Sequence, residues 1–95
     1  MIWDLTISDG YTITHRYFNK SKNALKAMAK MYNDLIDQYF DFSSRTTDDL
    51  TEDEKYWYDC SSLSEYSAIV FCNGEEVYVM DIAAIDLSRI KIEEE

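Results

Sequence analysis

The segment from Asp48 to Asp59 concentrates the side chains that could do chemistry. It holds six carboxylates and three large aromatic rings within twelve residues, with one lysine, Lys55, among them. The acids and aromatics are Asp48, Asp49, Glu52, Asp53, Glu54, Tyr56, Trp57, Tyr58 and Asp59. Neighbouring carboxylates suit acid–base catalysis, calcium binding or attraction of a basic partner. Each of these chemistries demands a different setting, so the sequence can be tested against all three.

The setting of these carboxylates favours neither catalysis nor metal binding. Acid–base catalysis needs a carboxyl group whose pKa is raised by burial beside apolar groups. The first acids of the segment lie in a loop and an expected first helical turn, where carboxylates stay ionised and solvated. A calcium loop needs a glycine at its sixth position, and no glycine occurs between residues 48 and 59. We therefore expect no enzyme activity, no metal and no cofactor.

The remaining nucleophilic and metal-binding residue types are few. Cys60 and Cys72 lack the CxxC spacing of zinc sites and are too few for a disulfide framework. We expect two reduced thiols, although their spacing leaves a disulfide open. His15 is the single histidine and alternates with apolar residues, which indicates a hydrogen-bonded core residue. No catalytic triad or phosphate-binding loop is visible.

Charge is distributed unevenly along the chain. The 95 residues carry a net charge of −10. Residues 1–30 hold two acids and five bases, residues 31–65 ten acids and two bases, and residues 66–95 seven acids and two bases. Such a surface repels nucleic acid and anionic membranes and attracts basic proteins. A lysine stripe is the exception, but against this net charge a solvated face is favoured for Lys20, Lys22, Lys26 and Lys30.

Length and composition predict one soluble domain, residues 1–95. Hydrophobic residues make up 46% and aromatic residues 15% of the chain, which is typical of a folded domain rather than a disordered acidic tail. We expect no signal peptide, and no apolar run reaches the roughly 18 residues that span a membrane. We expect a cytoplasmic protein that contacts neither membrane nor nucleic acid directly.

Alternation of apolar and polar residues predicts two hairpins. In residues 2–18, a three-residue loop ending at Gly10 pairs Ile7 with Tyr11 and Trp3 with His15, which keeps one apolar face. In residues 66–80, Asn73-Gly74 marks the second turn. Its strands carry apolar residues on both faces, with Val70 and Val77 expected on one and Ile69 and Tyr78 on the other. That pattern is typical of strands inside a sheet or at a subunit interface, so a homodimer stays open.

Helical patterns fill the region between the hairpins. Asn19 or Ser21 can cap a long helix that runs to about Asp41 and covers the sheet with its apolar face. Thr51 and Glu54 match a capping box, which predicts a short helix over residues 52–60. Residues 42–50 and 61–65 are expected to be connectors. The fold class is therefore α+β: an antiparallel sheet with an N-terminal β-hairpin, one long packed helix, a short acidic helix and a C-terminal β-hairpin.

The C-terminal residues after the second hairpin carry a weaker pattern. Residues 83–88 suggest a turn or short helix, and residues 90–92 a short strand. Residues 93–95 are three glutamates and are expected to be a frayed tail.

The long helix carries its charges in the order that its dipole disfavours. Lysines occupy the first half and Asp34, Asp37 and Asp41 the second, whereas the dipole favours acids first. The three aspartates are spaced by one turn, about 4.5–6 Å at 1.5 Å per residue. The acids of the short helix extend this row. Duplex DNA presents one charge per about 3.4 Å of each strand, so such a row can occupy a groove made for phosphates.

The aromatic residues next to these acids can strengthen an interface. Tyr56, Trp57 and Tyr58 can stack on arginines or fill pockets where bases would lie. We therefore predict a partner-binding surface made of the three aspartates of the long helix and the residues of the acidic segment. It comprises Asp34, Asp37, Asp41, Asp48, Asp49, Glu52, Asp53, Glu54, Tyr56, Trp57 and Tyr58.

The chain resembles the small phage-encoded anti-defence proteins in size, in its lack of catalytic motifs and in its acidic-aromatic segment, residues 47–59. That class includes anti-CRISPR and anti-restriction proteins that act as DNA mimics, and its members share no motif. The resemblance implies an inhibitor in the bacterial host cell that blocks the DNA- or guide-binding groove of a nuclease complex. The alternative is a small oligomeric or adaptor protein whose acids serve solubility only.

Overall fold

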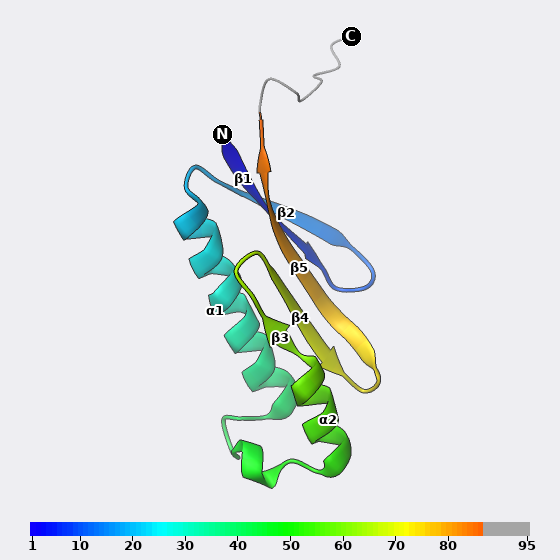
Figure 1. Ribbon diagram of the computed structural model, residues 1–95. Helices are drawn as coiled ribbons and strands as arrows, with labels where there is room; N and C mark the ends of the chain where they lie inside the picture. The colour runs from blue at the N-terminus through cyan, green and yellow to red at the C-terminus, as the bar shows by residue number, and fades with distance from the viewer. Residues whose placement is uncertain (87–95) are drawn as a thin grey trace.

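A five-stranded antiparallel sheet with helices on one side organises the chain (Figure 1). The computed structural model describes residues 1–86. The strand order is β2-β1-β5-β4-β3. The elements are β1 (Ile2–Ser8), β2 (Ile13–Phe18), α1 (Ser21–Phe40), the 3₁₀ helix η1 (Thr47–Asp49), α2 (Glu52–Cys60), β3 (Ser62–Leu63), β4 (Ser67–Cys72) and β5 (Glu75–Ile85). The predicted α+β class, with its N-terminal hairpin, is confirmed.

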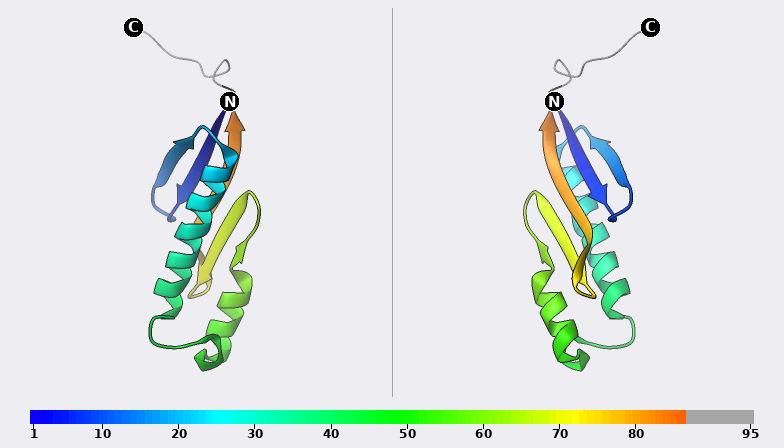
Figure 2. Two further views of the ribbon diagram at one scale, coloured as in Figure 1. Left: turned by 90° about the vertical axis from the view of Figure 1, so that its left-hand side faces the viewer. Right: turned by 90° about the vertical axis from the view of Figure 1, so that its right-hand side faces the viewer.

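The helix α1 covers one face of the sheet and leaves the opposite face open. Figure 2 shows α1 in front of the sheet in one view and behind it in the other. Beneath α1 the largest fully buried side chains are Phe40, Leu5, Met28, Met80 and Val70. These side chains come from both hairpins and from α1, so their packing in one core holds the two hairpins together in one sheet. No helix within residues 1–86 is long and apolar enough to cross a membrane.

The first hairpin forms, but its predicted register is wrong. Ile7 lies opposite Thr14 rather than Tyr11. The cause is Asp9, whose carboxylate accepts the backbone N–H groups of Tyr11 at 2.8 Å and Thr12 at 2.7 Å. The Asp9 N–H in turn bonds to the carbonyl of Thr12 at 3.2 Å. These bonds lengthen the loop beyond the three residues that the apolar pattern favours.

The register change places alternate β2 residues on the open face. Ile13 and Tyr17 are 65% and 61% exposed, and His15 lies opposite Thr6 rather than Trp3. The prediction that His15 is a core residue is therefore wrong. A shift by an odd number of residues, here three, exchanges the two faces of a strand, since successive side chains point to opposite sides.

The long helix matches its predicted extent. It begins at Ser21, with Lys20 as an N-cap that makes no side-chain bond, so neither predicted cap is used. It ends at Phe40, because Asp41 adopts a left-handed φ of 55° and its N–H bonds to the carbonyl of Asp37. No acid occupies the first turn and no base the last. The charge order that opposes the dipole is thus present in the folded helix.

The second hairpin contains a bulge that shifts the predicted pairing. The register changes between Val70 and Phe71, so Val70 lies opposite Tyr78, which was expected on the other face. The extra residue on β5 is Val77, as in a β-bulge. Tyr78 consequently shares the covered face with Val70, whereas Ile69 and its partner Val79 lie on the open face.

The strand β5 is longer than its local sequence predicts. The expected turn or short helix at residues 83–88 is wrong as far as Ile85, because Ala84 pairs with Trp3 and Ile85 with Ile2. Alanine has little strand preference of its own, so here the pairing with β1 decides. The predicted connector at residues 61–65 also contains the short strand β3. The strand and tail predicted for residues 90–95 lie outside the described residues.

Candidate acidic interface

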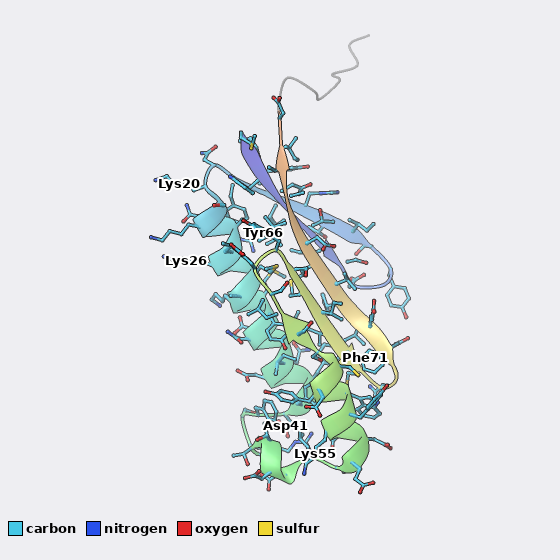
Figure 3. All side chains as sticks on the ribbon, viewed as in Figure 1. Lys20, Lys26, Asp41, Lys55, Tyr66 and Phe71 are labelled. Carbon is cyan, nitrogen blue, oxygen red and sulfur yellow. The ribbon has the colours of Figure 1, made fainter. Side chains whose placement is uncertain are left out.

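The end of α1, the helix η1 and the helix α2 lie together at one end of the molecule (Figure 1). Figure 3 shows Asp41 and Lys55 at this end and Lys20 and Lys26 at the other. Ile36, Phe40 and Leu50 join the ends of these helices in one buried cluster. We call the exposed acids here the acidic end. They are Asp34, Asp37, Asp41, Asp48, Asp49, Glu52, Asp53 and Asp59.

Two capping boxes hold the acid-bearing helices. The Thr51 hydroxyl accepts the Glu54 N–H at 3.2 Å, and the Glu54 carboxylate accepts the Thr51 N–H at 3.1 Å. This confirms the box predicted for α2. A second box opens η1, where the Asp49 carboxylate accepts the Thr46 N–H at 2.9 Å. Each box satisfies backbone donors that a helix start leaves unpaired, so short segments become helical.

Arg45 connects the end of α1 to α2. Its Nε donates to the carbonyl of Phe40 at 2.7 Å, and its Nη1 donates to Glu54 Oε1 at 3.2 Å. Its Nη2 donates to Glu54 Oε2, which completes a two-pronged ion pair. The hydrogen bond from Arg45, followed by that from the Thr51 backbone, lowers the pKa of Glu54 to about 2. Glu54 therefore serves this internal pair, and its side chain is only 20% exposed.

Acidification is expected to weaken the attachment of α2. The folded pKa of Glu54, about 2, lies below its ordinary value of 4.5, so folding favours the ionised form. The stabilisation is complete above pH 4.5 and is lost as the pH falls towards 2. Urea unfolding across this range should therefore show a smaller loss of stability in Glu54→Gln than in the unmodified protein.

Glu52→Gln is the matched control for this pH effect, because Glu52 lies in the same helical turn but makes no ion pair within residues 1–86. It should keep the full acid-dependent loss. Identical pH profiles for Glu54→Gln and the unmodified protein would contradict the role of the Arg45 pair.

The acidic end contains carboxylates with and without partners. Asp34 bonds to Lys30 at 3.0 Å, and Asp41 accepts the hydroxyls of Ser43 and Ser44. Those hydroxyl bonds, with Ser44 the larger contributor, lower the pKa of Asp41. Within residues 1–86 five other carboxylates of this end have no ion pair or hydrogen bond. They are Asp37, Asp48, Glu52, Asp53 and Asp59.

The three predicted aromatic residues divide between core and surface. Tyr58 packs edge-on against Phe40 at 5.6 Å between ring centroids, and Trp57 packs against the same buried cluster. Tyr56 is 63% exposed and touches the ring of Phe71 edge-on at 6.2 Å. Tyr56 is thus the aromatic residue of the trio that offers most of its surface to a partner.

A shallow hollow lies between η1 and α2. It has a volume of about 410 Å³ and is lined by Asp48, Leu50, Lys55, Tyr58 and Asp59, together with Thr47. The apolar side chain of Leu50 and the ring of Tyr58 thus line the hollow together with two carboxylates. A flat guanidinium group needs this combination of apolar surface and paired negative charge.

One polar grouping on the open face was missed from the sequence. His15 Nδ1 lies 3.0 Å from Asp4 Oδ2 and 3.4 Å from the Thr6 hydroxyl, and its ring stacks on Tyr17 at 6.1 Å. A catalytic triad uses both ring nitrogens, one for the acid and one for the nucleophile. Here acid and hydroxyl approach the same nitrogen, so the grouping is not a triad. The correct hairpin register would have revealed it.

No group of three or more metal-ligating side chains occurs in the described part of the chain. Cys60 and Cys72 are free thiols, and burial raises the pKa of Cys72. A scan against protein-family models and searches of the curated proteins and the solved structures returned no match.

Proposed function

We propose that this protein is a non-enzymatic inhibitor that uses its acidic end to occupy the nucleic-acid-binding groove of a basic partner. A CRISPR or restriction nuclease complex is such a partner. The observation that carries the proposal is the group of five carboxylates at one end that have no partner within residues 1–86. They come from three successive helical segments, so a single surface can offer them together.

The placement of charge on α1 supports a role outside the helix. The C-terminal end of a helix carries a partial negative charge, and aspartates there cost a few tenths of a kcal/mol each. Asp34 and Asp37 lie in the last two turns and Asp41 is the C-cap, with no base in the last turn. A local rule broken repeatedly is a common mark of a functional surface.

The hollow beside η1 offers a place for one basic side chain. Asp48 and Asp59 can pair with a partner's arginine while Tyr58 and Leu50 contact its flat face. Lys55 also lines the hollow and must move aside or share a carboxylate. Since exposed ion pairs contribute only about 0.2–1 kcal/mol each, affinity has to come from many pairs acting together.

Capture from a nuclease-treated bacterial lysate tests this function. The immobilised protein should retain nucleic-acid-binding proteins, identified by mass spectrometry, and release them on addition of excess duplex DNA or salt. Competition arises because DNA and the acidic end would occupy the same groove. Retention that excess duplex DNA leaves unchanged would contradict the proposal, whatever proteins are retained.

A further inference from the structure

The two edges of the sheet differ in how well they are protected. β3, at one edge, has only two residues. β2, at the other, has six residues, of which all but Phe18 are exposed. It contains no proline, no lysine and no register shift. Proline, lysine and a bulge are features by which proteins normally protect an edge strand, because an unprotected edge pairs readily with another chain. Within residues 1–86 no strand pairs with the outer side of β2.

The closing bond of the hairpin identifies the backbone groups that β2 offers. The Asp9 N–H bonds to the Thr12 carbonyl. In an antiparallel pair, bonded and non-bonded positions alternate from such a bond. Thr14 and Arg16 therefore point their backbone groups inward to β1. The N–H and C=O groups of the intervening residues, His15 at the centre of the strand among them, point outward.

Each face of the β2 edge offers a surface for the side chains of an added strand. On the helix side lies a groove of about 300 Å³ whose lining includes Thr14, Arg16, Met31 and Tyr78. Arg16 is held there, with Nη1 3.7 Å from the sulfur of Met31. On the open side, apolar β2 side chains are exposed. Strand addition gains affinity from backbone bonds and specificity from such alternating side-chain surfaces.

Charge indicates which kind of strand fits this edge. Two acids lie near the edge, since Asp9 also lines the groove and the carboxylate of Asp4 is paired with His15. Residues 10–33, by contrast, contain no acid and five bases, and the side chains of Lys20, Lys22 and Lys26 make no bond to any residue in 1–86. Figure 3 shows Lys20 and Lys26 at the end of α1 that adjoins β2. α1 has 20 residues and is therefore about 30 Å long, several times the Debye length of about 8 Å. The acidic end is thus screened from this edge.

We propose that β2 is a docking edge for an extended peptide rich in acidic side chains, which adds to the sheet as a sixth strand. This second partner is independent of the basic partner proposed for the acidic end. A second copy of the chain is a poorer occupant, because antiparallel pairing of β2 with β2 about His15 would bring Arg16 close to the Arg16 of the other copy. Like charges across a strand pair are destabilising.

Fluorescence anisotropy with a labelled peptide tests this edge. The probe is Glu-Val-Thr-Val-Glu-Val-Glu, and the comparison peptide has lysine in place of each glutamate. The acidic probe should bind at physiological ionic strength, and the lysine peptide should bind at least about tenfold more weakly. Replacing Lys20, Lys22 and Lys26 together with glutamine should weaken the acidic probe by about tenfold.

A matched pair of variants isolates the backbone contribution. His15→Pro removes one outward N–H without removing a bond to β1, since proline is tolerated at the solvent side of an edge strand. His15→Thr removes the same imidazole but keeps the N–H. Only the proline variant should lose binding, by about tenfold. Thermal unfolding checks that both variants are folded. If His15→Pro does not fold, Tyr17→Pro and its control Tyr17→Thr make the same comparison at another outward-facing position.

Three results would overturn the proposal. They are equal binding of the two peptides, unchanged binding by the folded proline variant, and self-association at this edge without peptide binding. The last would assign the edge to a second copy. Because charge reversal at the acidic end should leave peptide binding intact, this test fails or succeeds independently of the inhibitor function.

Discussion

Replacing Phe40 with alanine is expected to lower the free energy of unfolding by about 3–5 kcal/mol. Phe40 is 0% exposed, and its ring contacts Phe42 at 5.9 Å and Tyr58 at 5.6 Å between centroids. It therefore joins the last turn of α1 to α2, and its loss leaves a cavity where the two meet. Since small domains are stable by only about 5–15 kcal/mol, this change removes a large part of the total.

Urea denaturation followed by circular dichroism measures the effect of Phe40→Ala. Tyr56→Ala is a suitable control, because this neighbouring ring is 63% exposed and should contribute less than about 1 kcal/mol. A loss below 1 kcal/mol in Phe40→Ala would show that the acidic end is not anchored through this ring.

Reversing four acids of the acidic end is expected to weaken capture of the basic partner by about 100-fold. The replacements are Asp48→Lys, Asp49→Lys, Glu52→Lys and Asp53→Lys, and each adds two charges, which moves the net charge from −10 to −2. Four exposed pairs contribute about 1–4 kcal/mol together, and reversal adds repulsion to that loss. Quantitative capture at several salt concentrations, on the partner identified by DNA competition, measures the change.

A control variant with the same net charge separates the effect of where the acids lie from the effect of the total charge. Glu65, Glu75, Glu76 and Asp81 are exposed acids outside the acidic end, and their replacement by lysine also gives −2. This control should retain most of the binding. Equal losses in both variants would show that net charge alone attracts the partner, which is the behaviour of an acid surface that serves solubility.

Asp49→Lys also removes the carboxylate that caps η1, so the reversed protein needs a check of its fold. The loss of one cap costs about 1 kcal/mol, which leaves most of the stability in place. A variant that keeps Asp49 and reverses Asp59 instead holds the same net charge and leaves both capping boxes intact. It should lose binding to a similar extent.

Local signals were sufficient to predict the helices. The start of α2 follows from Thr51 and Glu54, because a capping box joins residues only three apart and needs no tertiary partner. The extent of α1 follows from its apolar periodicity, and Asn73-Gly74 marks the second turn. The α+β class could be predicted from such signals, since period and turn chemistry are properties of short segments.

Local signals could not predict which face of each strand is buried. The first hairpin differs from its predicted register because of the bonds of Asp9, and the second differs from its predicted faces because of the bulge at Val77. A slip of one residue exchanges the two faces of a strand, so a small local interaction decides which side chains are buried. For that reason His15 was placed in the core, whereas it lies on the open face beside Asp4.

The sequence by itself determined the acidic segment, its helix and the charge order along α1, because each depends on residue type and short spacing. Only the tertiary structure decided which parts of that segment are available to a partner. It assigned Glu54 to Arg45, packed Trp57 and Tyr58 on the core, left Tyr56 exposed and left four carboxylates of the segment exposed without ion pairs within residues 1–86. These outcomes depend on Phe40 and Arg45, which lie outside the segment, and on the buried cluster that joins α1 to α2. Contacts between segments are properties of the whole fold and are absent from local spacing.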